Sequence, residues 1–543
     1  MPGSISEDQA RIVRQGLAGM LWSKQYYSFE ADTWLEEHNC HPLLGQGGQA
    51  RNRDWYHMVN DDVISMPDKW EYPWYAAWDL AFHCVALSTV DCDLAKHQLD
   101  LMLRETYMHP SGQIPAYEWN YSDVNPPVHA FAILFLNRIE MQQGSPPDID
   151  FLKRTFLKLV SNFNWWVNRK DRSGKNVFEG GFLGLDNIGV FDRSSPLPTG
   201  GYLEQADGTA WMAMFCQNMI ELSIELASSD AAFQDMCYKF VEHFFWIASG
   251  MNRVGHDGMW DEEDGFYYDV LRLPDGSAQR LKVRSMVGLL PLGATTVIEK
   301  WQRERVPRVV ETWLKRMERM PELLQSVHAT GKDSLGVNDR GILALVSEQR
   351  LRRILARMLD ENEFLSPYGL RSLSRSHLEH PYVFHVKDTE FRVSYLPGES
   401  DTGMFGGNSN WRGPIWMPVN GLIIRALMQY YLYYGDSFRV ECPTGSGRLM
   451  NLFEVSKELV DRLGRIFLRD QSGRRPVFGG TEKFQTDPHW RDNLLFYEYF
   501  HGDTGAGLGA SHQTGWTGIV AKMIQMFGQL DAKAFLEAGK IRS

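Results

Sequence analysis

The stretch that decides the fold class reads Asp150-Phe-Leu-Lys-Arg-Thr-Phe-Leu-Lys-Leu-Val-Ser-Asn-Phe-Asn-Trp-Trp-Val-Asn-Arg169. Its apolar residues recur at intervals of three and four, the period that places side chains on one face of an α-helix. The apolar stripe consists of Phe151, Leu152, Phe156, Leu157, Leu159, Val160, Phe163 and Trp166. Asp148 or Asp150 stands where a side chain can cap the first turn. The stretch therefore predicts an amphipathic helix that buries a wide face.

The same period recurs from end to end of the chain and predicts a mainly helical protein. The expected helices are 7–22, 78–90, 94–107, 127–141, 150–169, 207–227, 231–250, 308–320, 347–358, 415–434, 451–467 and 514–528. One strand hairpin is expected, 265–273 with 278–283, because the residues between them have the composition of a tight turn. Strands do not alternate with helices, which disfavours a doubly wound parallel sheet.

These elements predict one all-α domain over residues 1–543, with residues 298–410 as an inserted or elaborated subregion. Long irregular loops and the hairpin are expected to gather at one end, which would be the active-site end. An (α/α)6 barrel of paired inner and outer helices needs about this many helices. An open helical solenoid needs a similar number, and the period alone does not distinguish the two.

The composition excludes several classes of protein. Fifty-six Lys and Arg against 68 Asp and Glu give a formal charge of −12, so we expect no nucleic-acid partner. No apolar run approaches the length of a membrane span, and the N-terminus lacks the pattern of a secretory signal. The six cysteines are scattered, which indicates free thiols in a reducing compartment. We therefore expect a cytoplasmic protein without a membrane partner; the oligomeric state is not readable.

No familiar cofactor or metal motif is present. The chain has no G-x-x-x-x-G-K-[ST], no H-E-x-x-H and no G-x-S-x-G. The glycine-rich run 505–510 is not part of a βαβ unit, and the acidic run 257–264 lacks the ligand spacing of a Ca²⁺ loop. We expect no cofactor and no metal in the site, with a structural Ca²⁺ left open.

Two segments place a carboxylate among aromatic residues. In Trp74-Tyr-Ala-Ala-Trp-Asp-Leu-Ala-Phe-His83, Asp79 is surrounded by indoles, which would desolvate it, raise its pKa and let it act as a general acid. In Phe496-Tyr-Glu-Tyr-Phe500, Glu498 has a similar setting and is a candidate base. Buried structural carboxylates are an equally simple interpretation of both residues.

The surrounding residues are typical of a sugar site. The chain holds 18 tryptophans, which indicate a cleft lined by aromatic rings or, alternatively, a tryptophan-rich core. Trp411-Arg-Gly-Pro-Ile-Trp416 supplies two indoles and a guanidinium, and the loop 509–518 supplies further hydrogen-bonding and stacking groups. Two carboxylates among such loops are the ingredients of glycoside hydrolysis.

The chain resembles glycoside hydrolase family 63 in four ordered motifs: Trp78-Asp-Leu-Ala-Phe-His83, Gln205-Ala-Asp-Gly-Thr-Ala-Trp211, Trp411-Arg-Gly-Pro-Ile-Trp416 and Ser511-His-Gln-Thr-Gly-Trp-Thr-Gly518. That family includes the processing α-glucosidase I and bacterial glucosylglycerate and mannosylglycerate hydrolases. The resemblance covers essentially the whole chain and implies an (α/α)6 barrel and an inverting mechanism. The sequence lacks the β-rich N-terminal domain of α-glucosidase I and has a longer 298–410 segment, which leaves the substrate open.

The resemblance also implies roles for single residues. Asp79 matches the general acid and Glu498 the general base. The expected substrate-binding residues, from the resemblance and from the chemistry of the same segments, are Trp74, Trp78, Asp207, Trp411, Arg412, Trp416, His512, Gln513 and Trp516. We therefore expect an inverting, exo-acting α-glucosidase whose partner is an oligosaccharide or a small α-glycoside.

Two other functions are considered. A sugar epimerase or isomerase on a similar barrel would use histidines as acid and base, and His83 and His512 are the candidates. A non-catalytic glycan-binding protein would keep the tryptophans without needing two carboxylates that face each other.

Overall fold

The structure is a computed structural model that describes residues 5–43, 48–169, 174–320, 328–329, 335–404, 409–512 and 514–540. Every helix expected from the sequence is present, with the largest shift at α4, which ends early. These helices are α1 (Glu7–Trp22), α3 (Ala77–Leu87), α4 (Cys92–Leu101), α5 (His129–Gln142), α6 (Ile149–Val167), α7 (Ala206–Leu226), α8 (Ala232–Met251), α10 (Pro307–Arg319), α12 (Glu348–Met358), α13 (Met417–Tyr434), α14 (Leu452–Arg465) and α16 (Thr514–Phe527). The mainly helical character is thus confirmed.

Helix α6 shows how the predicted stripe is used. Its side-chain cap is Asp148, which accepts a hydrogen bond from the amide of Phe151 (3.0 Å). Most of the stripe is buried from Phe151 to Trp166, but Val160 is half-buried, and Leu157, which lies at the edge, is exposed. Packing of this face against α7 holds the helix in place.

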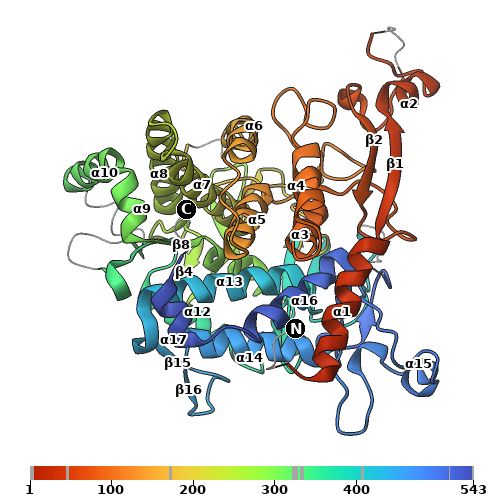
Figure 1. Cartoon of the computed structure of the whole chain (residues 1–543). Helices are drawn as coiled ribbons and strands as arrows, with labels where there is room; N and C mark the ends of the chain where they lie inside the picture. The colour runs from red at the N-terminus through yellow and green to blue at the C-terminus, as the bar shows by residue number, and fades with distance from the viewer. Residues whose placement is uncertain are drawn as a thin grey trace.

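The helices α3, α5, α7, α13 and α16 make a ring of contacts (Figure 1). α3 packs on α5, α5 on α7, and α13 on α16, which packs back on α3. Between α7 and α13, the 3-10 turn η3 (Leu290–Gly293) contacts both and takes the place of a helix. Around this ring, α1 packs on α3 and α16, α4 on α3 and α5, α6 and α8 on α7, and α14 on α13 and α16. A contiguous apolar core runs through the ring from Ile12 to Ile524.

Short helices that the period did not predict complete the structure. They are α2 (Ala31–Glu37), α9 (Lys300–Arg305), α15 (Glu482–Thr486) and α17 (Ala532–Ala538). Each has seven residues or fewer. Segments this short contain too few turns for an apolar period to be recognised.

Strands are more numerous than expected. The predicted hairpin is confirmed as β6 (Asp269–Arg272) paired antiparallel with β7 (Ala278–Leu281). The expectation of a single hairpin is wrong, because β1 (Lys24–Glu30) pairs with β2 (Val59–Ser65) and β13 (Tyr382–Val386) with β14 (Thr389–Val393). The other strands are β3 (Tyr202–Glu204), β4 (Trp260–Asp261), β5 (Phe266–Tyr267), β8 (Thr295–Ile298), β9 (His328–Ala329), β10 (Gly341–Ala344), β11 (Leu365–Ser366), β12 (Gly369–Leu370), β15 (Arg439–Glu441), β16 (Leu449–Asn451), β17 (Tyr499–Phe500) and β18 (Gly507–Leu508).

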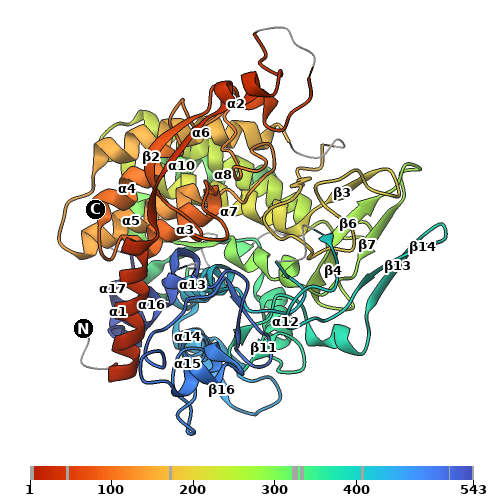
Figure 2. The same cartoon turned by 90° about the vertical axis from the view of Figure 1, so that its right-hand side faces the viewer.

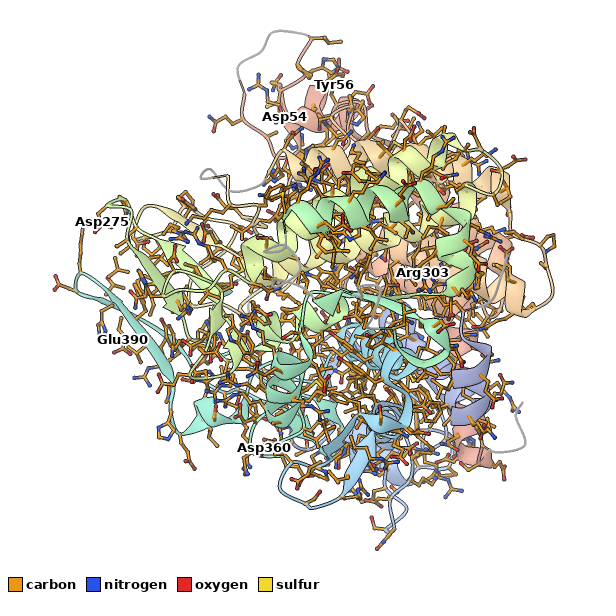
Figure 3. All side chains as sticks on the ribbon, turned by 90° about the vertical axis from the view of Figure 1, so that its left-hand side faces the viewer. Asp54, Tyr56, Asp275, Arg303, Asp360 and Glu390 are labelled. Carbon is orange, nitrogen blue, oxygen red and sulfur yellow. The ribbon has the colours of Figure 1, made fainter. Side chains whose placement is uncertain are left out.

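The β3–β6–β7 sheet and the β13–β14 hairpin project together from one side of the molecule (Figure 2). Figure 3 shows the molecule from the opposite direction, with Asp275, at the turn between β6 and β7, and Glu390 of β14 on the same projecting part. A second, smaller apolar core lies between them, where Phe191 meets Phe384 and Phe391 with ring centroids 5.5 and 5.1 Å apart. This core anchors the loop that precedes β3.

No helix within the described ranges is long and apolar enough to cross a membrane. All six cysteines are free, as predicted.

Candidate active site

A cavity of about 590 Å³ lies where the ring helices begin, a volume within the roughly 300–1,000 Å³ of small-molecule sites. It is lined by Pro67, Tyr72, Trp74, Ala76, Trp78, Asp79, Tyr117, Trp119, Asn125, Phe182, Gly184, Asp186, Ser409, Trp411, Trp416, Glu498 and Trp516. Both predicted catalytic carboxylates and all five predicted tryptophans are therefore in one place. They come from the start of α3 and the residues before it, the segment before α13, the residue before β17 and the first turn of α16.

Glu498 is enclosed by protein and is only 7% exposed. It precedes β17 and faces Ala510: the amide of Glu498 donates to the carbonyl of Ala510 (2.8 Å), and the amide of Ala510 donates to Oε2 of Glu498 (3.1 Å). Gly509 has a φ of +70°, and a Cβ there would collide with Oε2, so this position requires glycine. Burial raises the pKa of Glu498 well above its ordinary value, and the charges of Asp186 and Asp79 raise it further, while the Ala510 amide opposes them.

Asp186 is a third carboxylate of the cavity, and the sequence did not predict it. Burial raises the pKa of Asp186 to about 6, although a hydrogen bond with Ser409 and the charge of Arg193 oppose the rise. The next residue, Asn187, fixes the loop, because its side-chain oxygen accepts from the Trp411 amide (2.7 Å). An acid with such a pKa can hold a proton close to neutrality.

The sequence offered only a weak signal for Asp186. The rule that found Asp79 and Glu498 was the presence of aromatic neighbours in the sequence. Asp186 is flanked by leucine and asparagine, and its only distinction is its position in the long glycine-rich loop 178–206. The groups that tune it, Ser409 and Arg193, become its neighbours only in the fold.

Asp79 lies in the first turn of α3 and is partly exposed to the cavity. Unpaired amide groups and the helix dipole at such an end favour negative charge. Trp74 and Trp78 line the same cavity, as the sequence predicted. The sequence led us to expect that Asp79 is enclosed by indoles. In the structure Glu498 is enclosed more fully than Asp79.

The tryptophans form a rigid wall. Trp411 and Trp416 stack with centroids 3.9 Å apart and planes 3° apart, and Trp416 also stacks on Tyr499 at 4.7 Å. Trp78 meets Trp516 edge to face at 4.9 Å. Packed indoles lose little conformational freedom when a ligand binds, and their flat faces suit the apolar faces of sugar rings.

Trp119 is a further aromatic residue of the cavity that the sequence did not single out. It is 58% exposed, and the guanidinium of Arg51 lies 4.1 Å from its ring centroid. Arg51 is held in turn by Glu118 (3.1 Å). An exposed indole fixed in this way extends the aromatic surface beyond the enclosed part of the cavity.

Asp207 does not line the cavity, contrary to its predicted sugar contact. Its side chain is 0% exposed and forms an ion pair with Arg193 (2.8 Å). Arg193 also donates to the carbonyl of Phe182 (2.8 Å), which is a cavity residue. Burial and the charge of Asp207 raise the pKa of the neighbouring Asp269 to about 7. Asp207 thus belongs to a buried polar group behind the cavity wall.

Arg412 and His512 are also absent from the lining. Arg412 donates to the carbonyls of Asn187 (2.7 Å) and Gly189 (2.9 Å) and so clamps the loop that carries Asp186. The His512 amide donates to Asp68 (3.0 Å). Both residues therefore support the cavity from outside its lining. Gln513 lies outside the described residues.

The histidines expected of an epimerase are not in the cavity. His83 is fully buried, and its Nδ1 lies 3.0 Å from the hydroxyl of Ser65. Burial lowers the pKa of His83 to about 3, which keeps it neutral. No cluster of three or more His, Cys, Asp or Glu arranged to hold a metal ion is found in the described part of the chain. In the acidic run 257–264, Asp261 is paired with Arg280 and Lys282.

Comparisons with known proteins identify a family. Residues 191–453 match the Glycosyl hydrolase family 63 C-terminal domain, and residues 72–183 match the mannosylglycerate hydrolase MGH1-like glycoside hydrolase domain. A solved GH63 mannosylglycerate hydrolase from Thermus thermophilus, in complex with glucose, is 15% identical with a TM-score of 0.48, and the match covers 85% of this chain and 95% of that one.

Two curated relatives are from yeasts. The uncharacterized protein YMR196W of Saccharomyces cerevisiae is 49% identical over 551 residues, which cover 97% of this chain and 50% of the relative. The chain thus spans about half the length of that relative. A probable mannosyl-oligosaccharide glucosidase of Schizosaccharomyces pombe is 28% identical over 175 residues, 32% of this chain and 15% of the relative. With both family matches and the four ordered motifs, the chain belongs to glycoside hydrolase family 63.

Proposed function

We propose that the chain is an inverting, exo-acting α-glycosidase, and that its substrate is an α-linked glucoside. The observation that carries the proposal is the meeting of three carboxylates, Asp79, Asp186 and Glu498, in a cavity walled by indoles. A glycan-binding protein needs the indoles but not acids whose pKa values burial has raised. We also propose that the ring and its outer helices are an (α/α)6 barrel in which η3 occupies one inner position.

The roles follow from electrostatics. Protonated Asp186 donates its proton to the glycosidic oxygen while the bond from that oxygen to C1 breaks. Ionised Glu498 removes a proton from a water molecule, whose oxygen bonds to C1 on the opposite face of the ring. The products are the free sugar, with its anomeric configuration inverted, and the alcohol of the leaving group.

Asp186 is preferred to Asp79 as the proton donor for two reasons. Burial has brought the pKa of Asp186 to about 6, close to the working pH that suits a general acid. Asp79 lies in the first turn of α3, where backbone N–H groups at the helix end can donate to a carboxylate. In this proposal Asp79 accepts a hydrogen bond from a sugar hydroxyl.

The protonation states of the two catalytic groups are linked, because the charge of Asp186 contributes to the raised pKa of Glu498. Because burial raises the pKa of Glu498 as well as that of Asp186, part of the resting enzyme holds its proton on Glu498. The reactive form, with the proton on Asp186 and the charge on Glu498, is then a fraction of the singly protonated pair. Such a pair titrates with macroscopic pKa values that belong to both groups.

The substrate class rests on the relatives. The S. pombe protein is named a mannosyl-oligosaccharide glucosidase, and residues 72–183 match a mannosylglycerate hydrolase-like domain. An assay panel should therefore contain α-glucosides and α-mannosides, including an α-1,2-linked glucose disaccharide and both glycerate glycosides.

The test is proton NMR of the fresh product, recorded before the sugar mutarotates. We expect the β-anomer to form first from one α-glycoside of the panel, and the signal to vanish in Glu498→Gln. A matched control is Glu311→Gln, an exposed carboxylate of α10 outside the cavity lining. Initial release of the α-anomer would contradict inversion, and ligand binding without turnover across the panel would favour a glycan-binding protein.

A further inference from the structure

A second cavity lies inside the ring, at the end where α5, α13 and α16 finish. It measures about 230 Å³, below the roughly 300–1,000 Å³ of sites for drug-sized ligands. Its wall is mainly apolar and includes Phe131, Phe135, Leu422, Met428, Met523 and Phe527. None of the carboxylates of the proposed active site lines it, so the two cavities are distinct.

The charged side chains of this wall are all cations. Arg138, Arg425, Lys522 and Lys540 line the cavity, and the described lining contains no Asp or Glu. Cations in the apolar interior of a protein are normally paired with carboxylates. The C-terminal ends of the ring helices offset part of the charge, but they provide no carboxylate.

One carboxylate behind the wall balances the cluster incompletely. Glu221 forms ion pairs with Arg138 and with Lys540 (2.9 Å). Against the effect of burial, Arg138, Lys540 and Arg425 together lower the pKa of Glu221 to about 2. Glu221 thus balances one of the four cations that line the cavity, which leaves an excess of three positive charges. Burial also lowers the pKa of Arg425 to about 10 and that of Lys540 to about 8.

A separate observation concerns the amide of Asn218. This residue of α7 lines the cavity and is 0% exposed, and neither its side-chain oxygen nor its nitrogen has a hydrogen-bond partner among the described residues. Buried polar groups are nearly always hydrogen-bonded in folded proteins. An unpaired amide at the wall of a cationic cavity indicates that a polar ligand group is accepted there.

We propose that this second cavity binds a small monocarboxylate with an apolar chain. The carboxylate would lie among Arg425, Lys540 and Asn218, and the chain would lie against the phenylalanine and methionine side chains. The Arg425 guanidinium and the Asn218 amide can donate to it. The Lys540 ammonium, whose protons go to Glu221, Thr296 and Val297, would attract it by charge. A sugar does not fit this wall, because its hydroxyls would face apolar side chains without partners. The cavity is therefore a binding site of a different chemistry from that of the proposed active site.

The probe is sodium octanoate, with octan-1-ol as the neutral molecule of the same chain length. Calorimetric titration of the full chain should give saturable binding of octanoate, and octanol should bind at least tenfold more weakly. Asn218→Leu replaces the amide by an apolar group of similar size and leaves no unpaired polar atom, so the variant should fold. Its affinity for octanoate should fall at least tenfold.

Leu314→Ala is the matched control, because Leu314 lines a separate apolar cavity between α8 and α10. It should leave the affinity for octanoate unchanged. Arg425→Met tests the charge directly, and thermal unfolding will show whether that variant is folded. Equal binding of octanol and octanoate, no binding of octanoate at millimolar concentration, or unchanged affinity in Asn218→Leu would each overturn the proposal. Competitive inhibition of hydrolysis by octanoate would also overturn it, because that result would place the ligand in the active-site cavity.

Discussion

Replacement of Asp186 by asparagine should separate the proton donor from the other carboxylates. With an unactivated disaccharide, kcat/KM should fall by roughly 10²–10⁴-fold, the usual contribution of a general acid, or about 3–5 kcal/mol at 1.36 kcal/mol per tenfold change. With an activated aryl α-glycoside the loss should be small, because that leaving group departs without a proton. The charge of Asp186 contributes to the raised pKa of Glu498, so the variant should also lower the pKa of the remaining base.

Asp79→Asn is the matched comparison. If Asp79 binds a sugar hydroxyl, the loss is that of a charged hydrogen bond, about 1.5–3 kcal/mol or roughly 10–150-fold, and it is the same for both leaving groups. Initial rates over a series of aryl glycosides measure both variants. The loss in kcat/KM could instead depend on the leaving group in Asp79→Asn and not in Asp186→Asn. That result would refute the reasoning, and Asp79 would then be the general acid.

Three further predictions concern pH, substrate length and stability. The value of kcat/KM should fall below about pH 6, because Asp186 and Glu498 both hold protons there and no base remains; a pH–rate profile that stays level down to about pH 4.5 would contradict this. Trp119→Ala should raise KM for a trisaccharide roughly 2–10-fold, the worth of one aromatic contact, and leave it unchanged for a monosaccharide aryl glycoside. Trp70→Ala, at a residue 74% exposed outside the cavity lining, is its control and should change neither. Asp207→Asn should destabilise the fold by about 3–5 kcal/mol, because it breaks a buried ion pair, and a raised KM with an unchanged Tm would instead support a sugar contact.

The helices could be predicted because their signal is local. The stripe of α6 repeats within a single helix of 19 residues, and the packing that buries it follows from that repeat. The β1–β2 pair was missed because its strands are distant in sequence and no tight turn joins them. The β13–β14 hairpin has a two-residue connection, Lys387 and Asp388, which lacks the glycine or asparagine that usually identifies such a turn.

The site was predictable where residue type alone determines the chemistry. The five predicted tryptophans line the cavity, and flat indole faces suit the apolar faces of sugar rings whatever their neighbours. The role of a carboxylate is harder to predict, because it depends on the groups that pair with the carboxylate in the fold. Asp207 forms an ion pair with Arg193, whereas Asp186 has a hydrogen bond with the Ser409 side chain, a backbone hydrogen bond and the more distant charge of Arg193. Those partners are set by the loop before β3, whose conformation depends on contacts with residues far along the chain, such as Trp411.

The closure of the ring by α16 has a consequence for biosynthesis. The hydrogen bond from His512 to Asp68 joins residues 444 positions apart, and α16 packs on both α1 and α3. A nascent chain therefore carries α1 and α3 with uncovered apolar faces until translation reaches α16, a state that chaperones are adapted to protect. A premature stop before residue 498 yields an open arc of helices that lacks Glu498, so partial products of translation have neither a closed core nor the proposed general base.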